Sequence, residues 1–386
     1  MSLVSYQSQT AKRKNQPTTL LAVVFTATIF LSATLLFSVQ PMFTKLILPL
    51  LGGAPNVWNT AMVFFQALLL GGYIYAHLSA KYLAFKHQIG LHLVITAIGL
   101  AFLPLAVGTV TVPETDMPIF WLLGLFFATV GLPFFALSAN APLMQRWFSL
   151  TDHPDAQDPY FLYSASNVGS LLILCAYPVL IEPFISLSEQ TALWMVGYVI
   201  LILGAGFTGW IGFKQRTTER IHFKPNSIAT QSAPLARQTI LFWILLAFIP
   251  SSLMLGVTSF MTNNIASAPF LWIMPLALYL LTFVFAFAKK PILTSSRLGA
   301  FIPWVVLVNI GLIVFPSLQS FAVIGLCLLF FFVIAYYCHV RLVETRPEAS
   351  KLTAFYIVMS LGGVLGGVFN ALIAPVIFTD TYEYAL

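Results

Sequence analysis

The sequence contains very little charge. Only 8% of its 386 residues are Asp, Glu, Lys or Arg, whereas 59% are hydrophobic, and the mean hydropathy is +0.91. Soluble domains carry about 25% charged residues, so this chain could not cover a water-facing surface. The net charge of +6 does not indicate nucleic acid, because the sequence has no basic face interleaved with stacking aromatics. The composition predicts the lipid bilayer as a partner and no nucleic acid.

Motifs of catalysis and metal binding are lacking as well. Cys175, Cys327 and Cys338 all fall in apolar runs, without a disulfide framework or a CxxC pair. The chain has no Walker A, HExxH or GxSxG motif. A GxGxxG match at 204–209 lies inside an apolar run, where small residues permit close helix packing. We expect this chain to bind no cofactor and no metal ion and not to be an enzyme.

What the sequence does contain is a series of apolar runs, each long enough to cross a bilayer, which takes about 20 residues. None contains Asp, Glu, Lys or Arg, each of which would cost roughly 2.5–3.5 kcal/mol at mid-bilayer. The pattern predicts an all-α fold, a polytopic transmembrane helical bundle of about 11 spans. The predicted spans are 18–40, 57–79, 88–111, 118–142, 160–181, 190–213, 238–260, 270–288, 298–315, 318–338 and 352–378.

The basic residues sort to one side of this predicted bundle. Residues 1–17 form a tail, and residues 214–237 form a polar, basic connector between two apolar halves. If the amino terminus is inside, only Lys45 of the 18 Lys and Arg residues lies outside, as the positive-inside rule requires. We predict a bacterial inner-membrane protein with a cytoplasmic amino terminus and a periplasmic carboxy terminus. Residues 42–53, around Lys45, are too short to span and predict an interfacial helix or a re-entrant turn.

Short stretches recur at matching places in the two halves. APNVW opens the second run and APFLW the eighth, while PDA leads into the fifth run and PEA into the eleventh. The matches predict two parallel repeats of the major-facilitator type, 18–213 and 238–386. The second repeat has five spans, with the sixth missing. We therefore expect a truncated or split gene product, or a groove that a separate subunit fills.

Polar side chains form stripes on two of the predicted helices. On the second run they recur at spacings of 7, 7 and 4 residues, which puts them on one helical face. Buried polar groups in hydrocarbon need partners, so such stripes face the bundle interior or a water-filled cavity. They predict either a substrate or proton path or hydrogen bonds between helices. The candidate cavity-lining residues are Asn59, Gln66, Tyr73, His77, Tyr163, Asn167 and Ser170.

The loop between the fourth and fifth runs is the densest polar cluster outside the connector. Its charged residues predict a site for a cation such as a polyamine or a metal ion. Alternatively, Asp and Pro cap and turn the entry to the next helix. The candidate residues on this cytoplasmic face are Asp152, His153, Asp155 and Asp158.

Histidines lie at or near the predicted inner face. No HxxH or HxxxH spacing favours a metal site or a proton relay, so we expect lone interfacial residues. The histidines are His77, His87, His92, His153, His222 and His339.

Several stretches of the chain resemble one family. They are VQPMFTKLILPLLGGAPNVWNTAMVFFQALLLGGYIYAH at 39–77, TDHPDAQDPYFLYSASNVGSLL at 151–172, FIPSSLMLGVTSF at 248–260 and FYIVMSLGGVLGGVFNALIAPVIF at 355–378. The chain from about residue 20 onward resembles the spermidine-synthase-like polytopic membrane proteins, a fused major-facilitator/spermidine synthase type. In that family, a soluble domain resembling polyamine aminopropyltransferases follows the membrane region. This chain resembles the membrane region only.

The resemblance implies a transporter-like membrane region that handles a small cation such as a polyamine. The alternative is a non-transporting membrane anchor or scaffold for a soluble aminopropyltransferase-like domain or subunit. An intramembrane enzyme ranks below both, because the apolar runs lack paired ionisable residues.

Overall fold

The computed structural model describes residues 3–51, 55–108, 119–216, 236–264, 269–288, 293–314 and 321–378. Within these ranges the chain is helical, and its only β pairing is an isolated bridge between Thr151 and Arg216. Most of the predicted connector (217–235) and the carboxy-terminal tail (379–386) lie outside the described residues.

The helices fall into the two halves expected from the sequence. The first half holds α1 (Leu3–Leu51), α2 (Pro55–Tyr82), α3 (Phe85–Gly99), α4 (Ile119–Phe126), α5 (Leu132–Phe148), α6 (Phe161–Ala176) and α7 (Leu187–Lys214). The second half holds α8 (Arg237–Asn264), α9 (Pro269–Ala286), α10 (Ser295–Val314), α11 (Phe321–Glu344), α12 (Leu352–Val368) and α13 (Ala374–Ile377).

The predicted spans all contain a helix. Among the described residues, 9 helical stretches are long and apolar enough to cross a membrane. Two shorter apolar helices, Ile273–Ala286 and Ser295–Gly311, overlap the predicted eighth and ninth spans. The predicted third span is too long, because α3 and the 3-10 turn Leu100–Phe102 end just before Pro104, which cannot continue a helix. The chain is therefore a multi-pass helical bundle.

In the part of the chain that the structure describes, three spans contain π-helical turns. Phe127–Gly131 joins α4 to α5, Tyr177–Ile181 extends α6, and Phe369–Ile373 joins α12 to α13. Each turn lies within two residues of a proline or contains one, and such turns absorb the hydrogen bond that a proline removes. The fifth and eleventh spans each follow a short 3-10 turn and contain a π turn in their last part. The bounds of the two repeats stay a prediction.

Helix α1 departs from the sequence prediction. Residues 42–51 continue it without a break, so the predicted interfacial helix or re-entrant turn at 42–53 is wrong there. The first glycines that could end the helix are Gly52 and Gly53. Lys45 forms an ion pair with Glu182, with 2.5 Å between Nζ and Oε1. Lys45, the one basic residue expected on the outer side, is thus paired with an acidic side chain.

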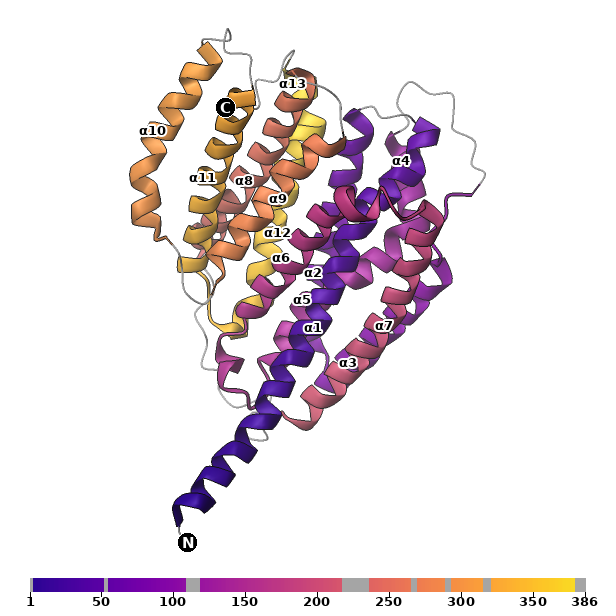
Figure 1. Cartoon of the computed structure of the whole chain (residues 1–386), viewed down its shortest axis with the longest axis vertical. Helices are drawn as coiled ribbons and strands as arrows, with labels where there is room; N and C mark the ends of the chain where they lie inside the picture. The colour runs from indigo at the N-terminus through magenta and orange to yellow at the C-terminus, as the bar shows by residue number, and fades with distance from the viewer. Residues whose placement is uncertain are drawn as a thin grey trace.

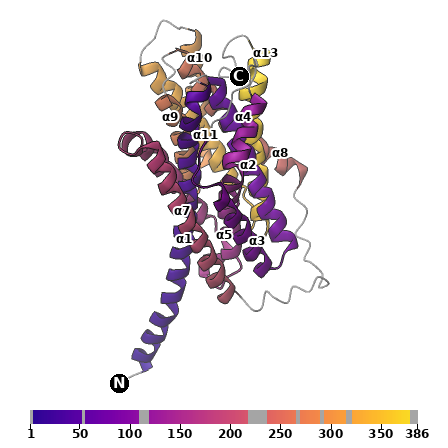
Figure 2. The same ribbon diagram turned by 90° about the vertical axis from the view of Figure 1, so that its right-hand side faces the viewer.

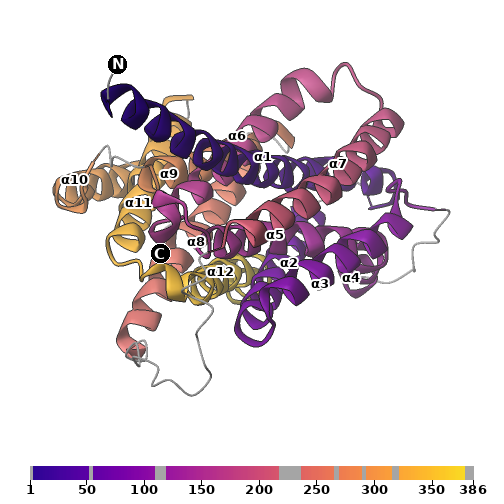
Figure 3. The same cartoon turned by 90° about the horizontal axis from the view of Figure 1, so that it is seen from below.

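The helices run roughly alongside one another, and the amino-terminal part of α1 projects beyond the bundle (Figures 1 and 2). Seen from that end, α9, α10 and α11 lie on one side and α3, α4 and α7 on the other (Figure 3). The helix pairs α2 with α12 and α6 with α9 make the most extensive contacts between the halves, and α5 also contacts α12. These helices form much of the surface between the halves.

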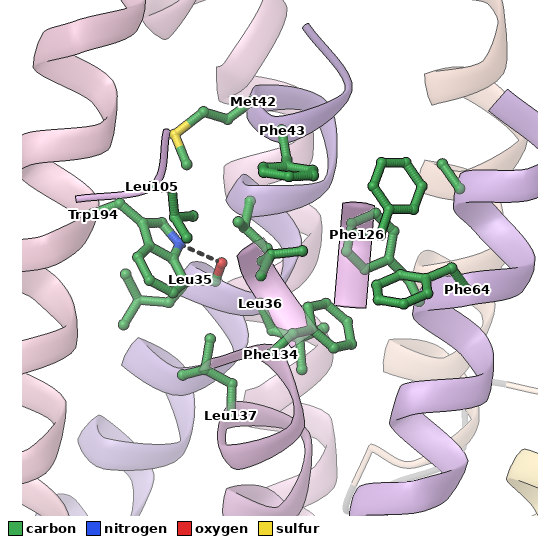
Figure 4. Packing of buried hydrophobic residues seen from close by; sticks show 14 of the residues in the cluster. Leu35, Leu36, Met42, Phe43, Phe64, Leu105, Phe126, Phe134, Leu137 and Trp194 are labelled. Atoms are coloured by element: carbon green, nitrogen blue, oxygen red, sulfur yellow. Dashed lines mark hydrogen bonds between the residues drawn. The ribbon is translucent and has the colours of Figure 1, made fainter. Parts of the chain in front are cut away.

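Apolar packing fixes the interior of each half. In the first half, the Phe126 ring makes an edge contact with Phe43 and a tilted contact with Phe64, with centroids 5.4 and 5.1 Å apart. Beside them, the Trp194 indole N–H donates to the Leu35 carbonyl oxygen at 2.9 Å (Figure 4). Burying large aromatic side chains contributes strongly to stability when the indole N–H finds a partner. The first half thus has its own core, behind the surface that faces the second half.

Candidate functional site

A cavity of about 160 Å³ lies between the two halves. Its walls come from α1, α2, α5 and α6 of the first half and from α8, α9 and α12 of the second. Apolar side chains make up most of the lining, with serine hydroxyls among them. The amide and phenol groups of the lining are Gln40, Gln66, Asn167, Tyr73, Tyr163 and Tyr279.

The polar stripes of the sequence converge on this cavity. The residues of the stripes that line it are Gln66, Tyr73, Tyr163, Asn167 and Ser170. His77 lies further along α2, where its Nδ1 is 2.9 Å from the Thr353 hydroxyl oxygen of α12. Asn59 belongs to α2, but its side chain is outside what the structure describes. The helical spacing on α2 and α6 thus brings these residues to the surface between the halves.

The lining is uncharged. None of the described lining residues is Asp, Glu, Lys, Arg or His. The Gln66 carbonyl oxygen and the Ser360 hydroxyl are buried there without a hydrogen-bond partner among the described residues. Buried polar groups are normally paired, so these two atoms are the unpaired hydrogen-bonding groups of the cavity wall. The cavity can therefore offer hydrogen bonds and apolar contact, but no ionic partner.

Gln66 reaches across the boundary between the halves. A Cβ added at Gly367 of α12 would overlap the side-chain amide oxygen of Gln66. The lack of a side chain at position 367 therefore lets the amide lie directly against the backbone of the opposite half. Gly367 positions Gln66 in the cavity wall.

At the end from which α1 projects, polar contacts join the halves. The Tyr356 hydroxyl donates to the Gln145 side-chain oxygen at 2.6 Å, and the Tyr160 hydroxyl donates to the Pro347 carbonyl oxygen at 2.9 Å. Arg346 donates to Asp158 at 2.9 Å. We call Gln145, Asp158, Tyr160, Arg346 and Tyr356 the seam cluster.

Aromatic rings back the seam cluster. Tyr163 stacks on Tyr356 with ring centroids 5.1 Å apart, and Tyr73 lies 6.0 Å from the same ring. The Arg346 guanidinium lies 4.8 Å from the centroid of the Tyr160 ring, a cation–π contact. Because Tyr73 and Tyr163 also line the cavity, one layer of rings separates the cavity from the seam cluster.

The polar loop before α6 serves several structural purposes. The His153 Nδ1 accepts from the Asp155 backbone N–H at 3.0 Å and so caps the 3-10 turn Pro154–Gln157. The cap is therefore His153, not the aspartates expected from the sequence. Asp158 pairs with Arg346 across the halves, and the Asp152 backbone N–H donates to the Gln215 carbonyl oxygen at 3.0 Å. No group of His, Cys, Asp or Glu among the described residues has the arrangement of a metal site.

Two histidines correct the expectation of lone interfacial residues. His92 on α3 and His339 on α11 have no exposed surface. The His92 Nε2 lies 3.3 Å from the Asn140 side-chain oxygen, and the His339 Nδ1 lies 2.8 Å from the Thr282 hydroxyl. Each imidazole is thus buried between helices of its own half. The spacing of histidines in the sequence could not reveal this burial. His222 lies outside the described residues.

Sequence reasoning missed much of the wall and of the seam cluster. The sequence analysis did not single out Tyr279, Ser360 or Gly367 as lining residues, because it followed the polar stripes of the second and fifth spans. Gln145 and Tyr356 are 211 residues apart and meet only in the folded chain. The matched PDA and PEA motifs, which open the fifth and eleventh spans, were the one available signal, since Asp158 and Arg346 flank them.

Comparison with known proteins places the fold. No protein-family model and no curated protein sequence matches the chain. Human MFSD10, an organic anion transporter, aligns with a TM-score of 0.58 and 15% identity, over 95% of this chain and 93% of its own. XylE of E. coli, in its inward-open conformation, aligns with a TM-score of 0.55 and 13% identity, over 95% of this chain and 91% of its own.

A bacterial homologue of the lysosomal transporter Spinster aligns with a TM-score of 0.50 and 14% identity, over 94% of this chain and 83% of its own. XylE is described as a major facilitator superfamily proton:xylose symporter. The fold of the chain is therefore similar to that of these major facilitator proteins.

Proposed function

We propose that the protein transports a small, uncharged, hydrogen-bonding solute across the membrane through the cavity between its halves. The observation that carries this proposal is the lining, which combines amides and hydroxyls with apolar side chains and has no charged group among its described residues. The fold supports transport, because related architectures bind their substrates near mid-membrane between two repeats.

The absence of charge in the lining supports an uncharged solute. An ion that leaves water loses its hydration, and an uncompensated charge in a protein interior is costly. The sequence has no Asp, Glu, Lys or Arg in any predicted span. A neutral solute with hydroxyl or amide groups could instead pair with Gln66 and Ser360, while its apolar face packs on the rings.

The seam cluster gives this transporter a closed end. To release a solute there, the halves must break the Tyr356–Gln145 and Tyr160–Pro347 hydrogen bonds and the Arg346–Asp158 ion pair. The ion pair is exposed and the two hydrogen bonds are single neutral bonds, and each kind contributes only about 0–1.5 kcal/mol, so rocking of the halves can exchange them for water. We assign this end to the cytoplasm of a bacterial inner membrane, because the loops there carry the excess of Lys and Arg.

The resemblance to spermidine-synthase-like membrane proteins supports two narrower candidates. A polyamine could place its ammonium groups over Tyr73, Tyr163 and Tyr279, since aromatic rings attract cations. It would find no carboxylate in the described lining, so we rank it below a neutral solute. The second candidate is an anchor for a soluble aminopropyltransferase-like subunit, for which the resemblance is the support.

Uptake into proteoliposomes tests the proposal. The purified protein should accelerate entry of members of a panel of neutral sugars, polyols and small amides, and should leave spermidine and organic anions outside. Asn167→Ala, in the lining, should lower uptake. Asn309→Ala, on α10 away from the cavity, is the matched control and should retain it. Uptake of spermidine alone would favour the polyamine, and no uptake of any solute would favour the anchor.

A further inference from the structure

The second half contains a buried base directly behind the cavity wall. His339 on α11 has no exposed surface. Its ring stacks on Phe283 with centroids 3.6 Å apart and lies edge-on to Tyr279 at 5.1 Å. Both of these rings line the cavity. The imidazole is therefore one ring away from the solute site.

Hydrogen bonding fixes which nitrogen of His339 is basic. The Thr282 hydroxyl has a single hydrogen, which it donates to the Tyr279 carbonyl oxygen at 2.6 Å. The Thr282 hydroxyl oxygen also lies 2.8 Å from the His339 Nδ1. Because its hydrogen is already used, this oxygen must accept the Nδ1–H of His339. The Nε2 consequently holds the lone pair, and it has no hydrogen-bond partner among the described residues. An imidazole held in this way keeps a free proton-accepting nitrogen in the interior.

We infer that His339 is a proton-binding site that controls opening of the seam cluster, an inference that rests on the proposed transport function. A proton from water adds to the Nε2 lone pair and converts the imidazole into an imidazolium. Histidine is the side chain suited to this exchange near neutral pH, and the predicted spans contain no carboxylate that could replace it.

Among the residues that the structure describes, none around His339 supplies a counter-charge that would favour the imidazolium in the present conformation. Helix α11 packs against α8, α9 and α10. Helix α9 presents Tyr279 and Thr282 to the ring. The acids and bases of α8 and α10 are Arg237 and Arg297, near the helix ends. On α11 itself, Cys338 is adjacent, and Arg341 pairs with Glu344 at 3.5 Å. An unpaired buried cation is costly, so protonation favours a conformation that admits water to Nε2.

Ring contacts connect His339 to the seam cluster. Phe283, which covers the imidazole, lies 5.7 Å from the Tyr163 ring. Tyr163 in turn stacks on Tyr356 at 5.1 Å, and the Tyr356 hydroxyl holds Gln145 of the other half. Water that enters to hydrate Nε2 must loosen the packing around the imidazole, of which Phe283 is part, and we expect this to disturb the stack that supports the Tyr356–Gln145 bond. Low pH should therefore open this end of the bundle.

Distance measurements between spin labels test the inference without any solute. In a Cys175→Ser background, which removes the exposed free thiol, labels at Gln157 and Ser350 report across the two halves. Both residues are exposed and flank the Asp158–Arg346 pair. In nanodiscs, the chain with native His339 should show short distances at about pH 8 and lose most of that population at about pH 5.

His339→Gln should keep the short distances at both pH values. His92→Gln is the matched control, because His92 is equally buried but contacts Tyr75 and Trp147, outside the lining; it should retain the pH response. The inference fails if the chain with both native histidines shows no pH response, a result that needs no substituted histidine to fold. It also fails if His339→Gln responds as its parent does. Failure of the transport proposal is distinct, since it would appear as absent uptake with an intact pH response.

Discussion

The contacts inside each half differ in kind from the contacts between the halves. Inside the second half, α12 lies so close to α8 that a Cβ at Gly362 or Gly366 would overlap backbone atoms of Ile244, Phe248 or Ser252. Between the halves, hydrogen bonds and ring stacks of the seam cluster predominate at one end. Close backbone packing has no room to rearrange, whereas polar side-chain bonds can be exchanged for water. The structure therefore combines close backbone packing inside the second half with side-chain contacts between the halves that can be broken.

A substitution that disrupts the close packing of α8 and α12 inside the second half should have the largest effect. Gly366→Ala places a methyl group against the Phe248 carbonyl oxygen and the Ser252 N–H, and over-packing of this kind typically costs about 1–3 kcal/mol. We expect a clear loss of thermal stability, measured by unfolding in detergent. Gly363→Ala, on the same helix with nothing near its added methyl group, is the control. Equal melting temperatures for the two variants would contradict the close α8–α12 packing.

The next effect tests the wall of the cavity, where the two regions meet. Gly367→Ala should push the Gln66 amide out of its place, and the polar contact that we propose for the solute should weaken. We expect uptake to fall severalfold. The apparent affinity for the solute should fall more than the expression level of the protein. Gln66→Ala, which removes the amide itself, should produce a similar defect, and the double variant should add little to it. If the losses of uptake in the two single variants added up in the double variant, Gly367 would not act through Gln66.

Removing one hydrogen bond from the seam cluster should have a smaller effect. Tyr356→Phe deletes the donor to Gln145 and keeps the rings of Tyr163 and Tyr356 stacked. A single bond of this kind contributes about 0.5–1.5 kcal/mol. We expect the Gln157–Ser350 distance distribution to shift toward longer values at neutral pH, while the melting temperature stays close to that of the unsubstituted chain. A large fall in melting temperature would place Tyr356 in the rigid part of the molecule.

The sequence alone indicated much of the rigid architecture and little of the breakable surface. A bilayer accepts only apolar, internally hydrogen-bonded helices, so uncharged runs and the side on which Lys and Arg gather located the spans. Helical spacing on α2 and α6 located Gln66, Tyr73, Tyr163 and Asn167, because a polar residue in hydrocarbon must face inward. The function of these residues stays a prediction.

Contacts that only the folded chain creates were out of reach. Gly367 matters because Gln66 lies against it, and the glycine pattern of α12 indicated only helix packing. His339 looked interfacial, since its place near a helix end said nothing about the rings of α9 that cover it. Helix α1 continues past residue 42, and Lys45 on it pairs with Glu182, a partner 137 positions away in the sequence. Pairing and burial of this kind depend on tertiary structure and leave no local pattern.

The smallest expected effect concerns the ion pair at the edge of the breakable surface. The Asp158 side chain is 62% exposed and that of Arg346 is 28% exposed, so water and salt screen their attraction. Exposed pairs contribute about 0–1 kcal/mol, less than the buried Tyr356–Gln145 bond. Asp158→Asn should leave stability nearly unchanged and shift the Gln157–Ser350 distances only at low ionic strength, because salt already weakens the native pair. Lys45→Met breaks the comparably exposed Lys45–Glu182 pair inside the first half and serves as the control, with no change in those distances. If Asp158→Asn opened the seam cluster more than Tyr356→Phe does, electrostatics rather than buried hydrogen bonding would hold the halves together at this end.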